Sequence, residues 1–124
     1  MAILLCFNGY YNITSAGNIP FDVTVGGTGT QDPLSKKAVK SDDGDNYAYY
    51  RATYVSNSTG YIMVASYNYD DHSIYTPQLT ELCSYNLNQT RSRSYNVDAP
   101  GNEYYYMQAS TSGPRIQVKG YYCP

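Results

Sequence analysis

The chain has 124 residues, enough for one modest core and too few for two, so we expect a single domain over residues 1–124. A formal net charge of −2 and a charged fraction of 15% argue against nucleic-acid binding by phosphate neutralisation and against a charge-extended disordered chain. Tyrosine supplies 17 residues, Phe 2 and Trp none, so much of the apolar surface carries a hydroxyl group that needs a partner or water.

The chain begins with an apolar run, MAILLCF, over Met1–Phe7. No basic residue precedes this run, and it is shorter than the apolar part of a secretory signal or a membrane span. We therefore interpret it as a β-strand, and we expect neither a signal peptide nor a membrane span in this sequence.

A cysteine stands beside a Gly-Tyr-Tyr triplet near both ends of the chain, in CFNGYY and KGYYCP. Antiparallel folds commonly return the last strand beside the first, which predicts stacked tyrosines and a candidate disulfide between Cys6 and Cys123 in an oxidising setting. Two alternatives remain open: all three cysteines, including Cys83, are free buried thiols, or the amino-terminal strand pairs with a neighbouring subunit. The absence of C-x-x-C spacing and the single histidine exclude the common zinc patterns.

The rest of the chain is typical of β-structure, because Tyr-, Val-, Ile- and Thr-rich segments alternate with Gly, Pro, Asn and Asp clusters. The stretch Asp32–Lys40, with a proline ahead of good helix formers, predicts either two helical turns or a surface loop. Single strands are expected at Ile19–Val25, Ile74–Tyr85 and Ser92–Val97.

Two hairpins are predicted from strand pairs with short turn-like connections. In the first, SNSTG joins Asn46–Val55 to Tyr61–Tyr69, and in the second, TSGP joins Asn102–Ser110 to Arg115–Cys123. With the amino-terminal segment, the strands number about eight, which favours an all-β antiparallel sandwich or jelly-roll-like domain.

Alternation within these strands predicts their faces. In the first hairpin, Tyr54 shares a face with Ala48, Tyr50 and Ala52, while Val55 lies on the opposite face with Tyr47. In the last strand, one buried face is expected to hold Ile116, Val118 and Gly120, and one wet face Gln117, Lys119 and Tyr121.

Catalytic and metal-binding patterns are sparse. His72, the only histidine, lies in YDDHS beside Asp70 and Asp71, which is either a metal or acid–base site or a solvated turn. The SDDGD segment offers Asp42, Asp43 and Asp45 as calcium ligands but lacks the later Glu of an EF-hand. The glycine-rich VGGTGT segment lacks the Lys-Ser/Thr of a phosphate loop. We therefore predict no catalytic residue, metal or cofactor, and no enzymatic activity.

Sequons occur at Asn12, Asn57 and Asn88, and they matter only in a secreted eukaryotic setting.

Tyrosine offers a wide contact area with few rotatable bonds and is enriched at recognition surfaces. We therefore predict a structural protein that assembles into a homo-oligomer or filament, as a phage-like virion component or an extracellular filament subunit. Its contacts are expected from the terminal strands and from seven tyrosines: Tyr47, Tyr49, Tyr104, Tyr105, Tyr106, Tyr121 and Tyr122. The alternative is a carbohydrate-binding or adhesive module with a glycan partner, although the lack of tryptophan counts against it.

Overall fold

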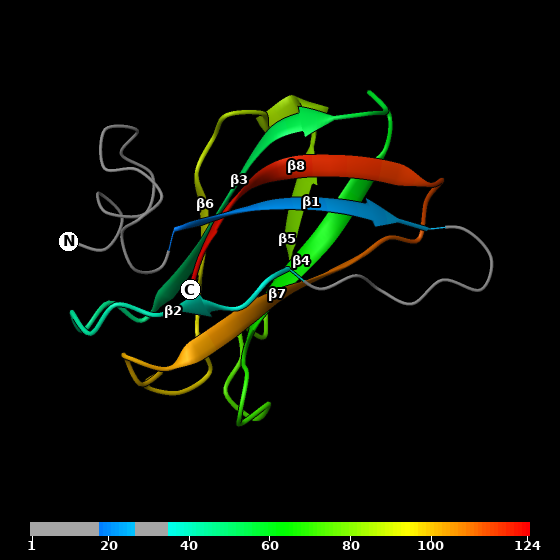
Figure 1. The fold of residues 1–124 in the computed structure, drawn as a ribbon. Coiled ribbons are helices and arrows are strands. Elements are labelled where there is room, and N and C mark those ends of the chain that lie inside the picture. Colours follow the sequence, from blue (N-terminus) through cyan, green and yellow to red (C-terminus); the bar gives the residue numbers. More distant parts are fainter. Residues whose placement is uncertain (1–17, 27–34) are drawn as a thin grey trace.

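The computed structural model describes residues 18–26 and 35–124, and the described chain forms eight strands in two antiparallel sheets. The predicted all-β, sandwich-like class is confirmed. The first sheet has the order β1 (Ile19–Val25), β8 (Ile116–Cys123), β3 (Tyr47–Val55) and β6 (Arg91–Ser94). The second has the order β2 (Ala38–Val39), β7 (Tyr104–Ser110), β4 (Tyr61–Asn68) and β5 (Thr80–Cys83). In Figure 1, β1, β8 and β3 lie side by side, and β7 and β4 cross beneath them.

Strand β1 has the bounds predicted from the sequence, and its period of two sets its place in the sandwich. Phe21, Val23 and Val25 point into the core, whereas the residues between them are exposed. Pro20 is tolerated because β1 is an edge strand, where a missing N–H costs no ladder hydrogen bond.

Strand β8 lies between β1 and β3, and its predicted alternation is confirmed: Ile116, Val118 and Gly120 are buried, whereas Lys119 is exposed. The predicted faces of β3 hold only up to Ala52. A β-bulge adds Thr53, so that Tyr54 pairs with Lys119 on the outside and Val55 pairs with Val118 against the core. The sequence assignment was therefore wrong for the last two residues of β3.

Neither predicted hairpin forms. Strands β3 and β4 belong to different sheets, and so do β7 and β8, so both short connections cross from one sheet to the other. After Val55, the Ser56 N–H still donates to the Gln117 carbonyl at 2.9 Å, which keeps the chain paired with β8 until it crosses. Alternation shows which side chains of a strand are buried, but strands from opposing sheets bury their side chains in the same core and give the same pattern.

Two further expectations are corrected. The described part of Asp32–Lys40 is not helical, because Ala38 and Val39 pair with β7 as the edge strand β2. The predicted strand Ile74–Tyr85 is broken: Tyr75 makes an isolated bridge with Tyr67, β5 begins at Thr80, and a short 3-10 helix, η1, covers Ser84–Asn86. In both places tertiary pairing and local turns override the preference of the segment.

The predicted amino-terminal strand and the first Gly-Tyr-Tyr triplet lie outside the described residues. Among described strands, the first does lie beside the last, with Ile19 opposite Tyr122. The described part of the chain contains no helix with the length and apolar character needed to cross a membrane.

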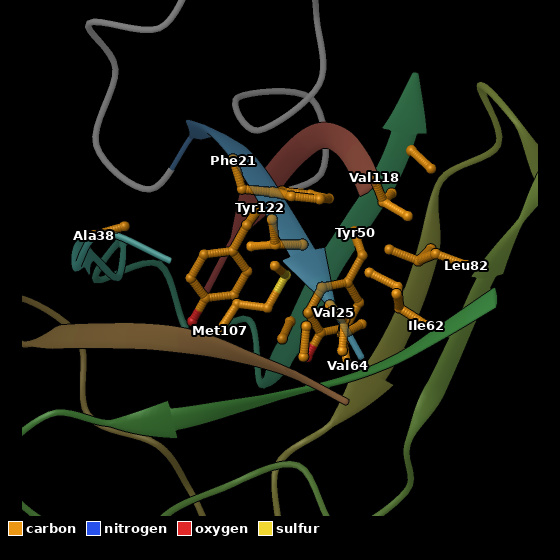
Figure 2. Packing of buried hydrophobic residues seen from close by; sticks show 14 of the residues in the cluster. Phe21, Val25, Ala38, Tyr50, Ile62, Val64, Leu82, Met107, Val118 and Tyr122 are labelled. Carbon is orange, nitrogen blue, oxygen red and sulfur yellow. The ribbon is translucent and has the colours of Figure 1, made fainter. Parts of the chain in front are cut away.

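The core fills the space between the two sheets and contains tyrosines as well as aliphatic residues (Figure 2). Tyr50, Tyr105 and Tyr122 have no exposed surface. Their hydroxyl groups are satisfied inside: Ser66 Oγ bonds both the Tyr95 and the Tyr122 hydroxyl, and the Tyr105 hydroxyl donates to the Pro100 carbonyl at 2.8 Å. A core poor in aliphatic residues is thereby completed with buried tyrosine rings.

Candidate binding surface

The outer side of the second sheet carries a continuous group of aromatic side chains, which we call the tyrosine face. Strand alternation puts them there: Ser66 and Asn68 point inward, so Tyr67 points outward, and it pairs directly with Tyr106 on β7. The turn after β4 brings Tyr75 back beside Tyr67. The face consists of Tyr67, Tyr69, Tyr75, Tyr104 and Tyr106.

Three of these rings form a stack. Tyr67 lies between Tyr75 and Tyr106, with ring centroids 5.8 and 5.7 Å apart and interplanar angles of 10° and 20°. Tyr69 then meets Tyr106 edge-on at 6.4 Å and 87°. Because each ring is held by its neighbours, the surface is ordered before any partner arrives, which lowers the entropy cost of binding.

A bulge in the edge strand places two lysines over this face. Ser35 and Met107 exchange hydrogen bonds at 2.8 and 2.9 Å, and the next pair is Ala38 with Tyr105. Lys36 and Lys37 therefore stand opposite the single residue Tyr106, the arrangement of a β-bulge. Bulges often redirect a side chain near a functional site, and here the redirected side chain is Lys37.

The Lys37 ammonium lies over two of the rings. Its Nζ is 4.5 Å from the centroid of Tyr69 and 4.8 Å from that of Tyr104, within the range of cation–π attraction. Tyr69 and Tyr104 are the most exposed members of the face, at 49% and 47%. The lysine is thus held in place by exposed aromatic surface.

An open hollow of about 650 Å³ lies beside Lys37 and is lined by Ser35, Lys36, Lys37, Tyr69, His72 and Tyr106. His72 closes one side, with its Nε2 at 3.3 Å from the Tyr106 hydroxyl and its ring edge-on to that tyrosine at 5.7 Å. The hollow therefore combines aromatic walls, two ammonium groups and a histidine, within the size range of small-ligand sites.

The seven tyrosines expected at an interface lie in different surroundings. Tyr104 and Tyr106 belong to the tyrosine face, and Tyr47 is exposed on the outer side of the first sheet. Tyr121 is half-buried on that sheet, and Tyr49 is a buried residue whose hydroxyl donates to Asp45 Oδ2 at 2.6 Å. Burial and this contact raise the pKa of Tyr49. Tyr105 and Tyr122 are core residues and add nothing to an exposed surface.

The acidic segments serve local structure. Asp43 and Asp45 accept hydrogen bonds from nearby backbone N–H groups, and Asp71 Oδ1 accepts both the N–H and the hydroxyl of Ser73, which holds the pKa of Asp71 below its usual range. Across the described residues, no three His, Cys, Asp or Glu side chains are grouped as metal ligands, so the calcium hypothesis for SDDGD has no support.

The cysteines and sequons add little to the site. Cys83 is a buried free thiol, and Cys123 is buried, but Cys6 lies outside the described residues, so the Cys6–Cys123 disulfide stays a prediction. Asn57 and Asn88 lie in surface turns, whereas Asn12 is also outside the described residues.

Sequence reasoning gave Lys37 and Tyr75 no role in this surface. The abundance of tyrosine was a usable signal, but the register of β4 against β7 and an isolated bridge determine which rings meet, and a bulge determines where Lys37 lies. Comparison with protein-family models, curated proteins and solved structures finds no match for the chain. The function is therefore argued from the tyrosine face itself.

Proposed function

We propose that this chain is a non-enzymatic building block that binds further copies of itself through the tyrosine face. The observation that supports the proposal is a preassembled group of five partly exposed tyrosines on the outer side of a sheet. Grouped aromatic side chains of this kind are enriched at the centres of protein interfaces, where burial of their rings drives association.

The ring arrangement favours a protein partner for most of the face. Both sides of Tyr67 are occupied, by Tyr75 and by Tyr106, so the stack presents ring edges and hydroxyl groups outward. A sugar ring needs a free aromatic face, whereas a protein surface can contact edges and accept hydrogen bonds from hydroxyls. A virion or an extracellular filament is the setting we propose for such a building block.

The test is the mass of the purified protein over a concentration series, by light scattering on a sizing column, with negative-stain microscopy of the same samples. We expect a fixed oligomer or filaments from the wild-type chain. Replacing Tyr69 and Tyr104 together by Ser should weaken association at least about tenfold, because both side chains are about half exposed and contribute little to the core.

The matched control replaces Tyr54 and Tyr85 by Ser. These two are also exposed, at 45% and 90%, but neither belongs to the tyrosine face. A wild-type chain that stays monomeric at every concentration, or a control variant that loses association as strongly as Tyr69→Ser/Tyr104→Ser, would refute the proposal.

Carbohydrate recognition is the second candidate, and one observation favours it. The hollow beside Lys37 offers the rings of the exposed Tyr69 and the partly exposed Tyr106 as walls, next to the hydrogen-bonding groups of His72 and the lysines. Shallow aromatic walls with a few polar groups fit a sugar ring at the end of a chain. Binding of an oligosaccharide by a chain that stays monomeric would favour this candidate over self-association.

A further inference from the structure

The Lys37 ammonium lines an open hollow, and two tyrosine rings hold it in position before any ligand binds. A free lysine side chain loses much rotamer freedom when it binds a ligand, but Lys37 is already positioned by Tyr69 and Tyr104. These two rings are the contacts recorded for its Nζ within the described residues, and ring faces leave ammonium N–H donors for a ligand oxygen. The side chain is exposed and so can be reached from solvent.

Charge and shape around this lysine point to one class of ligand. Lys36 lies in the same bulge and adds a second positive charge, although the chain as a whole has a net charge of −2. A carboxylate placed near Lys37 would gain charge-assisted hydrogen bonds. Next to Lys37, the rings of Tyr69 and Tyr106 meet edge to face at 87° and form a corner of the hollow.

We propose that this hollow binds an acidic saccharide, with a uronate carboxylate on Lys37 and the sugar ring against the corner of Tyr69 and Tyr106. The inference rests on the carbohydrate-recognition candidate and specifies its ligand class. His72 Nε2 and the Tyr106 hydroxyl, which lie 3.3 Å apart, line the same hollow and would hydrogen-bond to the hydroxyl groups of the sugar. An acidic peptide shares the carboxylate but not the ring, which makes it the natural competitor.

The experiment is calorimetric titration of the full chain with an oligogalacturonate and with a neutral galacto-oligosaccharide of equal length. We expect the acidic sugar to bind at least about tenfold more tightly, the change that accompanies one hydrogen bond to a charged group. Lys37→Gln removes the charge and should abolish most of this preference. Lys119→Gln is the matched control, because Lys119 Nζ lies over the ring of Tyr54, at 5.4 Å, on the other sheet.

The possible outcomes of the titrations separate acidic specificity from carbohydrate recognition as such. Equal affinity for both sugars, or equal losses in Lys37→Gln and Lys119→Gln, would overturn the acidic specificity while leaving carbohydrate recognition in place. An oligoglutamate that binds as tightly as the oligogalacturonate would show that the site reads charge alone, which also overturns the proposal. No binding of either sugar would remove the carbohydrate candidate itself, and self-association is decided separately by the light-scattering series.

Discussion

Tyr50 and Tyr122 stack face to face in the core, with ring centroids 5.8 Å apart and planes inclined by 17°. They are direct cross-strand partners on β3 and β8, and both are fully buried. The closing Gly-Tyr-Tyr triplet is thereby explained: Gly120 and Tyr122 face the core, and Tyr121 faces outward. The second tyrosine of the triplet seals the sandwich, so it belongs to stability and not to recognition.

The buried hydroxyl group of Ser66 should matter more than its size suggests. Ser66→Ala removes the shared partner of the Tyr95 and Tyr122 hydroxyls, which then have only each other, and lost hydrogen bonds to buried groups cost about 1–3 kcal/mol. We expect the free energy of unfolding, measured by urea titration, to fall by about 2 kcal/mol. Ser94→Ala, at an exposed position of β6, is the control and should change it by less than about 0.5 kcal/mol.

A triple variant separates the hydrogen bonds from the packing. Ser66→Ala combined with Tyr95→Phe and Tyr122→Phe removes all three hydroxyls and leaves no orphan, so most of the lost stability should return. If the triple variant is less stable than Ser66→Ala alone, the network itself stabilises the fold and our explanation is wrong.

Alkaline pH should unfold the protein through its buried tyrosines. Burial raises the pKa of Tyr50, Tyr95 and Tyr122 above the ordinary value of 10.0. Above pH 10, unfolded tyrosine releases its proton while these three keep theirs, so the unfolded state binds fewer protons and stability falls as pH rises. Each contributes a loss of about 1.4 kcal/mol per pH unit above its unfolded pKa.

The measurement is the free energy of unfolding at a series of pH values on both sides of 10, with tyrosinate absorbance followed in parallel. Tyr122→Phe should reduce the slope, because it removes one fully buried group with a raised pKa, whereas Tyr50 and Tyr95, and also Tyr49, Tyr105 and Tyr106, keep contributing. An unchanged slope in that variant would show that Tyr122 ionises as freely in the native protein as in the unfolded chain.

Lys40 should make stability rise with pH, which is opposite to the effect of the buried tyrosines. Only 2% of this residue is exposed, and burial lowers the pKa of its amine from the ordinary 10.5, although Asp45, Asp43 and Asp98 oppose the shift. Between the lowered pKa and 10.5, the unfolded state binds the proton better, so the contribution of Lys40 to stability rises with pH. Compared with Lys40→Met, the wild type should therefore gain stability as pH rises toward 10.5.

Taking this difference between wild type and Lys40→Met removes the shared tyrosine effect. Lys119→Met, at an exposed site of β8, is the control for the loss of a lysine side chain. A constant difference for Lys40→Met would mean that the Lys40 amine titrates normally despite its burial, helped by its 2.6 Å hydrogen bond to the Asp45 carbonyl.

Strand positions were largely predictable because alternation is a local property. Strand β1 has the predicted bounds, and β8 starts one residue later than predicted, because each strand has one face in the core. The sheet to which each strand belongs was not predictable. A two-residue edge strand such as β2, and a bulge such as that at Thr53, depend on neighbours that are distant in the sequence.

In the candidate site, too, the position of each tyrosine depends on strands that are distant in the sequence and could not be predicted. In the run Tyr104–Tyr106, only pairing with β4 and β2 decides that the middle ring is core and the outer two are surface. Lys37 gained its place from the bulge opposite Tyr106, for which the sequence holds no local signal. A tyrosine-rich surface could be predicted from the sequence, whereas its location and its lysine could not.

Gly120 should be the glycine least tolerant of substitution in the described chain. A Cβ there would lie 2.0 Å from the Arg51 carbonyl oxygen and 2.9 Å from Phe21 Cζ. The first of these atoms is backbone and cannot turn aside, and the strand next to it is already bulged beyond Ala52. We expect Gly120→Ala to lower the free energy of unfolding by about 3 kcal/mol, at the upper end of overpacking effects.

Gly113→Ala is the matched control, because its Cβ would meet nothing closer than 3.6 Å, which is ordinary contact. It should leave the stability within about 0.5 kcal/mol of the wild type. Combining Gly120→Ala with Phe21→Leu tests the cause: if the ring of Phe21 were the main obstacle, the smaller side chain would restore stability. Because the carbonyl of Arg51 is the nearer atom, we expect no such rescue, and a rescued double variant would assign the role of Gly120 to ring packing instead of strand pairing.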